Sequence, residues 1–129
     1  MGQSYLIDTN AVIELIAGKL PTSGEEWVEN ILITEDAYLS IINRIELLGF
    51  NGPTQEMDAL SNFVTSVTVL PLSDEIAEKS IWVRKQKKIR LPDAIIAATA
   101  LVHSLVIISR NTKDFKDIEG LKVKNPHNQ

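Results

Sequence analysis

The length and composition of the chain limit the kind of protein it can be. Its 129 residues, of which 44% are hydrophobic, are enough for one domain with a sizeable core. The formal net charge of −4 argues against a broadly basic protein that coats nucleic acid, although a local basic patch is compatible with it. Because the chain has no cysteine, disulfides and thiolate metal sites are excluded, and any metal ion must be held by oxygen ligands or by the two histidines.

Neither a targeting segment nor a membrane span is expected. The N-terminal stretch lacks a cationic start and carries Asp8 and Glu14 where a signal peptide would be apolar, so it is interpreted as mature protein. The longest nearly apolar stretch, residues 94–108, is interrupted by His103 and Ser104 and is shorter than the roughly 20 residues of a bilayer span. With the absence of cysteine, this predicts a cytoplasmic protein.

The first half of the chain alternates short apolar runs with helical patterns. Strands are expected over residues 4–8 and 37–40, and helices over residues 11–18, 25–33, 41 to about 49, and 54–66. The helix that begins at Ile41 is expected to stop near Gly49 and Gly52. The repeating unit is therefore a strand followed by helices.

The second half continues this alternation. A β-branched strand is expected over residues 67–72, and Ser73 is typical of an N-cap for a helix that opens with Ile76. The helix from Asp93 to about His103 has almost no polar face and must be buried, and Pro92 with Asp93 makes a well-formed helix start. Strands are expected over residues 105–109 and, at an edge, 121–124. Residues 1–125 are interpreted as one domain and 126–129 as a polar tail.

Four acidic residues lie near the ends of these elements: Asp8, Glu46, Asp93 and Asp114. Asp8 and Asp114 come just after candidate parallel strands, where open α/β folds place their ligand crevice. Carboxylates gathered there repel one another, so the placement predicts an acidic site that needs a cation.

Each acid also has a structural interpretation. Asp8 could cap the following helix, as could Thr9 or Asn10, and Asp93 is a still better cap candidate. Asp114 could cap a turn. Capping and metal binding are compatible, because one carboxylate oxygen can serve each role.

Glu46 is expected to be partly desolvated, because it borders the apolar residues Ile42 and Ile45 on a mid-chain helix. A carboxylate in such a place is costly without a partner. The alternative to a metal ion is an ion pair with Arg44, Lys113 or another base.

Four motifs carry a resemblance to a known family. They are LIDTN at residues 6–10, SIINRIEL at 40–47, LPDAIIAATA at 91–100 and ISRNTKDF at 108–115. In this order and spacing the chain resembles the PIN-domain ribonucleases, and most closely the VapC-type toxins of prokaryotic toxin–antitoxin pairs. The resemblance implies a three-layer α/β/α fold with a central, mostly parallel sheet of four to five strands.

The resemblance also implies the site. The metal-binding acids of the family map onto Asp8, Glu46, Asp93 and, less directly, Asp114. Many relatives carry an aspartate at or near the position of Asn111, which leaves open which side chain completes the site and whether one or two metal ions bind. The expected partners are RNA as substrate, a cognate antitoxin that plugs the groove, and a second copy of the chain.

Such acids suit metal-assisted hydrolysis of phosphodiesters. Mg²⁺ or Mn²⁺ relieves the repulsion between carboxylates, prefers oxygen ligands and makes a water molecule acidic enough to attack phosphorus. We expect Asp8 and Asp93 to be the principal ligands, and Asp114 to take an outer or second-metal role. Glu46 is expected either to orient the attacking water or to hold the ion through a water molecule.

The substrate contacts are expected from cationic and polar residues near the acids. Thr9 and Ser109 could position a carboxylate or a phosphate. The remaining candidates are Arg84, Lys85, Lys87, Lys88, Arg90, Arg110 and Asn111. Basic residues there would bring RNA phosphates to an acidic site, but a solvated helix end explains residues 84–90 equally well. Since aromatic residues are few, recognition of RNA shape or of an exposed loop is expected.

Two other functions compete with the nuclease. A dehalogenase-like phosphatase would use Asp8 as nucleophile, but the second acid of such enzymes, two residues later, is Asn10 here. A non-catalytic PIN-like module that binds RNA or protein would retain the acids as caps and ion pairs. Trp27, Val28, Phe50 and Phe63 could lie at partner surfaces, although a core position is expected for each.

Overall fold

The computed structural model describes residues 2–129. Its strands are β1 (Tyr5–Ile7), β2 (Ala37–Ser40), β3 (Thr68–Leu70), β4 (Val106–Ile108) and β5 (Val123–Lys124). Its α-helices are α1 (Thr9–Ile16), α2 (Thr22–Ile33), α3 (Ile41–Leu48), α4 (Thr54–Ser66), α5 (Asp74–Gln86), α6 (Leu91–Val102) and α7 (Thr112–Phe115), followed by the 3₁₀ helix η1 (Pro126–Asn128). No helix in residues 2–129 is both long and apolar enough to cross a bilayer.

The strands form one parallel sheet with the order β3-β2-β1-β4-β5. This confirms the expected mostly parallel sheet of four to five strands. β1 lies at the centre, where Leu6 is paired with Tyr38 of β2 on one side and with Ile107 of β4 on the other. Because all strands run the same way, their carboxyl ends meet at one edge of the sheet, and Asp8 follows β1 directly at that edge.

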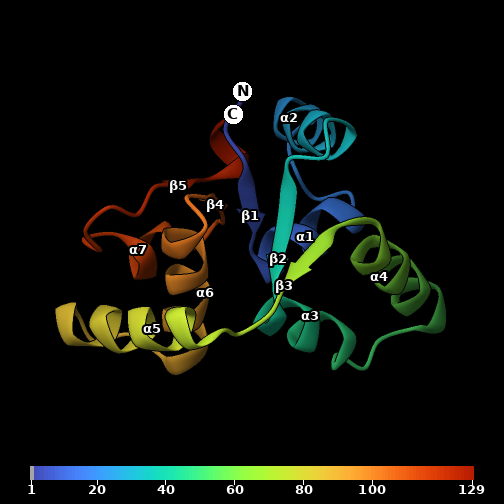
Figure 1. The fold of residues 1–129 in the computed structure, drawn as a ribbon. Helices are drawn as coiled ribbons and strands as arrows, with labels where there is room; N and C mark the ends of the chain where they lie inside the picture. Colours follow the sequence, from blue (N-terminus) through green and yellow to red (C-terminus); the bar gives the residue numbers. More distant parts are fainter. Residues whose placement is uncertain (1) are drawn as a thin grey trace.

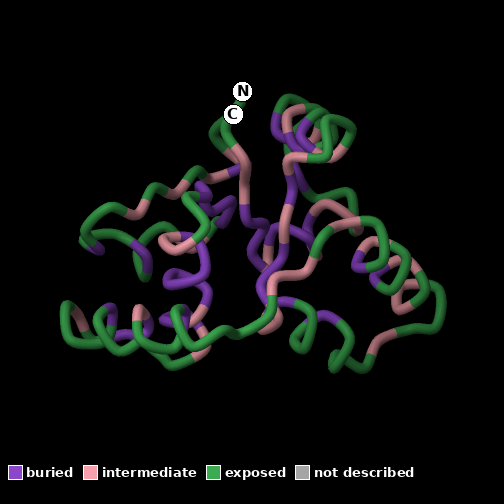
Figure 2. Tube along the Cα trace, viewed as in Figure 1, coloured by how far each residue is buried: buried purple, intermediate pink, exposed green. Residues whose placement is uncertain are grey.

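Helices cover both faces of the sheet, as Figure 1 shows. Successive strand residues point to opposite faces: Ile7 and Ile108 pack with α1, α2 and α4, whereas Leu6 and Ile107 pack with α5, α6 and α7. The buried residues in Figure 2 are concentrated in the central strands and in α6. The chain therefore has the three-layer α/β/α arrangement that the resemblance to the PIN-domain ribonucleases implied.

Two of the expected helix caps differ from the structure. Asp8 is the N-cap of α1, and its side chain accepts a hydrogen bond from the backbone N–H of Thr9. Asp93, in contrast, is not a cap, because α6 begins two residues earlier at Leu91, and the cap residue is Arg90. The cap of α7 is Asn111, whose side chain accepts from the backbone N–H of Asp114. The carboxylates of Asp93 and Asp114 are thus not occupied by capping.

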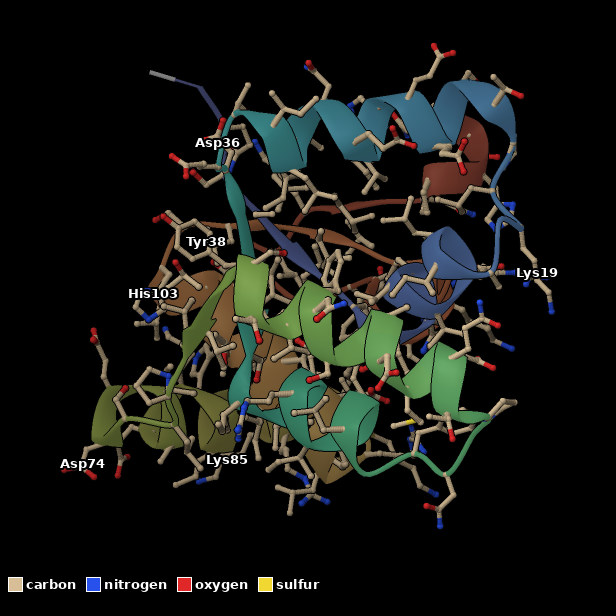
Figure 3. All side chains as sticks on the ribbon, turned by 90° about the vertical axis from the view of Figure 1, so that its right-hand side faces the viewer. Lys19, Asp36, Tyr38, Asp74, Lys85 and His103 are labelled. Atoms are coloured by element: carbon tan, nitrogen blue, oxygen red, sulfur yellow. The ribbon has the colours of Figure 1, made fainter. Side chains whose placement is uncertain are left out.

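The C-terminal residues, interpreted from sequence as a polar tail, are ordered against the body. η1 packs beside the start of α2 (Figure 3), and Pro126 is buried. A Cβ atom added to Gly24 in α2 would lie 1.9 Å from the carbonyl oxygen of Pro126, so only glycine allows this approach. His127 Nε2 lies 3.0 Å from Oε2 of Glu14 in α1. These contacts attach the end of the chain to α1 and α2.

Candidate functional site

An acidic pocket lies at the carboxyl-end edge of the sheet. Its volume is about 220 Å³, and it is lined by Asp8, Thr9, Asn10, Ile13, Glu46, Arg90, Asp93 and Asn111. The lining residues come from α1, α3, α6 and the loop after β4, which are segments far apart in the sequence. The structure thus brings three of the four sequence-predicted acids into one pocket and leaves Asp114 outside its lining.

Asp8 is the most constrained of these acids, with only 5% of its surface exposed. Its Oδ1 accepts from Thr9 N (2.9 Å) and Asn43 Nδ2 (3.3 Å), and its Oδ2 accepts from Ser109 Oγ (2.8 Å) and Asn10 Nδ2 (3.2 Å). Burial raises the pKa of Asp8, the hydrogen bonds from Ser109 and Thr9 oppose that rise, and the negative charges of Asp93 and Glu46 add to it. Asp8 is therefore a fixed, partly dehydrated carboxylate.

Asn43 and Thr9 connect Asp8 to Glu46. The buried Asn43 accepts from Ser40 N through Oδ1 and donates through Nδ2 to Asp8 and, at 3.1 Å, to Thr9 Oγ1. The Thr9 hydroxyl then donates to Glu46 Oε1 at 2.6 Å. The carboxylates at the end of β1 and on α3 are thus held in a fixed relation by one amide and one hydroxyl group.

Glu46 itself differs from the expectation. It is exposed and forms no ion pair within residues 2–129, so neither the partly desolvated carboxylate nor the ion pair with a neighbouring base is present. The reason is that Ile45 is 59% exposed, so this part of α3 faces solvent and not the core. Its hydrogen bond from Thr9, and not burial, positions the Glu46 carboxylate.

Asp93 is buried at the start of α6 and forms an ion pair with Arg90. Its surface is 5% exposed, and its Oδ2 lies 3.2 Å from Arg90 Nε. The hydrogen bond to Asp93 and the charge of Asp93 raise the pKa of the Arg90 guanidinium, with smaller contributions from the charges of Glu46 and Asp114. The Arg90 side chain is 74% exposed, so the ion pair is open to solvent and contributes little stability.

Asp114 lies next to the acidic pocket and not in it. Its Oδ2 accepts from Asn111 Nδ2 at 2.8 Å, and Asn111 reaches the acidic pocket. Asp114 lines a second pocket together with Arg84, Lys88, Ile89 and Arg90. Asn111 therefore lies between Asp114 and the other acids. The sequence left open whether Asp114 or Asn111 completes the site, and of these two only Asn111 lines the acidic pocket.

Three sequence-predicted cations point elsewhere. Arg110 Nη1 lies 3.0 Å from Oε2 of Glu14, a residue of α1 that does not line the acidic pocket. Lys87 Nζ donates to the carbonyl oxygens of Lys113 and Lys116, which ties the end of α5 to α7. Lys85 is exposed and lines neither of the two pockets. Arg90, Arg84 and Lys88 are the predicted cations that do line these pockets.

Sequence reasoning missed the two asparagines that organise the site. From the sequence, Asn10 is a candidate cap and stands where a dehalogenase-like phosphatase has its second acid. In the structure its amide donates to Asp8 and Ser109 and its Oδ1 accepts from Arg110 N. Asn43 belongs to the SIINRIEL motif, which by itself assigns it no role. The signal that could have identified Asn43 is its place in the sequence, one helical turn before Glu46. An amide that is buried there needs hydrogen-bond partners, and the nearest are the side chains of the site.

The donors present are compatible with a divalent cation of the magnesium type. Within residues 2–129, no three acidic or histidine side chains converge closely enough to enclose a metal ion. Mg²⁺, however, usually keeps several waters and needs only one or two carboxylates. Asp8 and Asp93 supply two buried carboxylates in one pocket, and Glu46 lines the same pocket. All donors are oxygens, as a hard cation prefers.

Comparison with known proteins identifies the family. The sequence model described as "PIN domain" matches residues 5–121. The chain is 30% identical over 131 residues to Ribonuclease VapC1 of Rickettsia felis, with 92% of each chain covered. A toxin–antitoxin complex from Klebsiella pneumoniae contains a chain that is 31% identical, with 95% of this chain and 98% of that chain covered and a TM-score of 0.74.

A third match supports the fold alone. The DNA-bound VapBC structure from Salmonella typhimurium is 23% identical, covers 97% of this chain and 99% of that chain, and has a TM-score of 0.81.

The dehalogenase-like alternative has no support in these matches, and Asn10 is a hydrogen-bond donor to Asp8 where that chemistry needs a second acid. The chain therefore belongs to the PIN-domain family and, within it, to the VapC-type proteins.

Proposed function

We propose that this protein is a divalent-metal-dependent endoribonuclease, the toxin of a toxin–antitoxin pair. The observation that carries the proposal is the acidic pocket, in which the buried Asp8 and Asp93 lie with Glu46 at the carboxyl ends of parallel strands. Buried carboxylates that repel one another are poised for a cation. The name of the Rickettsia felis relative, a ribonuclease, supports RNA as the substrate.

The residues divide the chemistry between them. Asp8 and Asp93 would hold Mg²⁺ or Mn²⁺, which when bound makes a water more acidic and offsets charge on the leaving oxygen. Asp8 already accepts four hydrogen bonds, so one of the longer ones, from Asn10 or Asn43, would give way to the cation. Ser109 would continue to orient the carboxylate.

Glu46 would act on the attacking water. Its Oε1 is held by Thr9, and within residues 2–129 its Oε2 accepts no hydrogen bond, so Oε2 is free to take a proton. The water oxygen then bonds to phosphorus and the bond from phosphorus to the 3′ oxygen breaks. The leaving 3′ oxygen takes a proton from solvent, and Glu46 returns its proton to solvent. Asp114, outside the pocket, would have an outer role.

The partners in this proposal are RNA, an antitoxin and a second copy of the chain. The toxin–antitoxin complex that matches this chain at 31% identity supports the antitoxin. Large apolar side chains that are exposed on α3 and just after it, including Ile45, Leu48 and Phe50, support a surface that another protein covers. Val28 is buried, and Trp27 and Phe63 pack against the core, so Phe50 alone departs from the expected core position. Cellular RNA as substrate would place the protein in the cytoplasm.

The proposal is tested by incubating purified protein with structured and unstructured RNAs in Mg²⁺, in Mn²⁺ and in chelator. Asp93→Asn is compared with Asp58→Asn, the same change at an exposed site on α4. Cleavage that needs metal, is lost in D93N and persists in D58N supports the nuclease. Equal cleavage by D93N would reveal a contaminating enzyme, and no cleavage of any RNA by the folded, metal-loaded protein would overturn the proposal.

One observation favours the non-catalytic module instead. Asp8 has four hydrogen-bond donors and Asp93 has Arg90, so both acids have partners without a metal ion. A module of this kind would bind RNA or protein equally well with and without chelator. Isothermal titration with Mg²⁺ separates the two functions, because the module predicts no saturable heat that depends on Asp8.

A further inference from the structure

One buried carboxylate has no part in the proposed mechanism. Glu14 on α1 is 9% exposed and does not line the acidic pocket. Its Oε2 lies 3.0 Å from Arg110 Nη1 and 3.0 Å from His127 Nε2, whereas its Oε1 is buried with no hydrogen-bond partner within residues 2–129. Burying a carboxylate with one oxygen unsatisfied is unfavourable. Natural folds retain such a cost where the residue serves a site, so the segments that Oε2 joins are informative.

Glu14 joins two distant segments to α1. Arg110 is 96 positions away, in the loop after β4, and His127 is 113 positions away, in η1. η1 also packs on α2 (Figure 3), so His127 belongs to a segment that is already anchored. The Arg110 side chain is 66% exposed, and an ion pair so open to solvent contributes little stability. The contact between Glu14 and Arg110 therefore fixes the place of a loop more than it stabilises the fold.

This loop holds Asp8. Ser109 Oγ donates to Asp8 Oδ2 at 2.8 Å, the shortest of the four hydrogen bonds that Asp8 accepts, and it accepts from Asn111 N at 2.9 Å. Arg110 N donates to Asn10 Oδ1 at 3.1 Å, and Asn10 Nδ2 donates to Asp8 Oδ2 at 3.2 Å. Asn111 also lines the acidic pocket. A shift of residues 109–111 would therefore disturb both hydrogen bonds to Asp8 Oδ2.

Residues 109–111 need an anchor, because they belong to no helix or strand. Ser109 N donates to Lys124 O of β5 at 3.0 Å, which holds one side of the loop. Asn10 and Glu14 hold the other side from α1, where they lie one helical turn apart and face the same way. Asn10 bonds the backbone of Arg110, and Glu14 bonds its guanidinium. Arg110 is thus attached to α1 at both ends.

We propose that Glu14 is a positioning residue for the acidic pocket, and that His127 makes η1 part of the same support. Glu14 holds Arg110 against α1, so the loop keeps its hydrogen bond to Asp8. His127, with a hydrogen on Nε2, donates to the same carboxylate oxygen and limits the conformations that Glu14 can adopt. The inference rests on the proposed function only in that the acidic pocket binds a divalent cation, which a loosely held Asp8 would bind more weakly.

The sign of one effect separates positioning from simple electrostatics. Removing the positive charge of Arg110 would by itself favour a cation in the acidic pocket, whereas a loosened loop disfavours it. Isothermal titration with Mg²⁺ should therefore give Arg110→Ala a Kd about tenfold larger than that of the wild type, the low end of the effect of groups that orient a metal ligand. Arg110→Lys keeps a long cationic side chain and should restore most of the affinity.

Lys19→Ala is the matched control. Lys19 is an exposed cation just after α1, and in the described part of the chain it forms no ion pair. Its side chain does not line the acidic pocket. The Kd of K19A for Mg²⁺ should stay within about twofold of the wild-type value, because solvent screens an exposed charge that makes no contact with the site.

Amide hydrogen exchange in chelator tests the positioning without a metal ion. The N–H groups of Arg110 and Asn111 donate to side chains of the site. Both should exchange about tenfold faster in R110A and in Glu14→Met, which keeps a side chain of similar length but removes the carboxylate. The N–H of Leu6, in the central strand, should keep its wild-type rate, because global stability is not what Glu14 supplies.

The role of η1 is tested by His127→Ala, with the exposed His103→Ala as its control. H127A should raise the Kd for Mg²⁺ and both exchange rates by about threefold, less than R110A, because Glu14 still holds Arg110. Wild-type values in H127A would overturn the role of η1.

Wild-type or tighter Mg²⁺ binding by R110A, with unchanged exchange at Arg110 and Asn111, would overturn the role of Glu14. Exchange at Leu6 that accelerates by the same factor would overturn it too, because the loss would then be one of global stability. A wild-type protein that binds no Mg²⁺ would count against the proposed function, and the exchange rates in chelator would still decide this inference.

Discussion

The amide of Asn43 is predicted to be the most sensitive part of the site. It is buried, and it joins the start of α3 to Asp8 and Thr9 through three hydrogen bonds. Replacing Asn43 with alanine removes all three. The backbone N–H of Ser40 then loses its acceptor in the capping box, while Asp8 and Thr9 each keep other partners.

The size of the effect follows from these partners. An orphaned buried donor costs about 1–3 kcal/mol, and an ordinary lost hydrogen bond about 0.5–1.5 kcal/mol. The bond to Asp8 is long, at 3.3 Å, so its share is small. We therefore expect N43A to lower the free energy of unfolding by about 3 kcal/mol, a large part of the 5–15 kcal/mol typical of a domain.

Urea unfolding at pH 7 measures this loss, and Asn43→Asp is the matched variant. An aspartate retains the acceptor for Ser40 N but places a second carboxylate against Asp8. Repulsion between the two carboxylates raises the pKa of the pair in the folded state. The folded state then takes up a proton more readily than the unfolded state, so N43D should gain stability relative to wild type as the pH falls from 7 to 4. A loss below 0.5 kcal/mol for N43A, or a pH-independent N43D, would refute the reasoning.

Three further predictions concern Asp8, the metal and the C-terminus. In chelator, NMR titration should give Asp8 a pKa above 3.8, its ordinary value. The contribution of Asp8 to stability is then fully present below pH 3.8 and is lost as the pH rises through the pKa of the folded state. A titration midpoint below 3.8 would contradict this prediction. Mg²⁺ at about 100 times its Kd should stabilise the wild type by about 2.7 kcal/mol in thermal unfolding but not Asp8→Asn, and an equal gain in both would exclude Asp8 as a ligand. Gly24→Ala should lower the free energy of unfolding in urea by about 1–3 kcal/mol, because its Cβ would lie 1.9 Å from Pro126 O. Gly2→Ala is the control, because a Cβ there meets nothing within 4 Å. Equal urea midpoints for the two variants would show that η1 does not pack on α2.

Sequence patterns were most informative where the cause of structure is local. The order of strands and helices follows from apolar periodicity, and the cap role of Asp8 follows from its place directly before α1. Glu46 shows the limit of this approach. Ile42 and Ile45 suggested a core-facing helix stripe, but whether such a stripe meets the core depends on how α3 lies against its neighbours. Periodicity carries no information on that placement.

Side-chain pairing over long distances was beyond the sequence. Arg110 was expected to contact the substrate because it lies near Asp114 in the sequence, but its guanidinium forms an ion pair with Glu14, 96 positions away. Four carboxylates were predicted to form one site, and three of them line the acidic pocket, whereas Asp114 does not. The hydrogen bonds that hold Asp8 come in part from Asn43 and Asn10. A cation such as Arg110 has many possible partners, and only the fold selects one.

The bond between Asp8 and Ser109 joins residues 101 positions apart, across two neighbouring strands. This has a consequence for the protein during its own synthesis. Asp8 leaves the ribosome well before Asp93, and 101 residues before Ser109. A growing chain therefore cannot assemble the acidic pocket until these later residues have emerged. The proposed nuclease would therefore be inactive in every nascent chain from which Ser109 has not yet emerged.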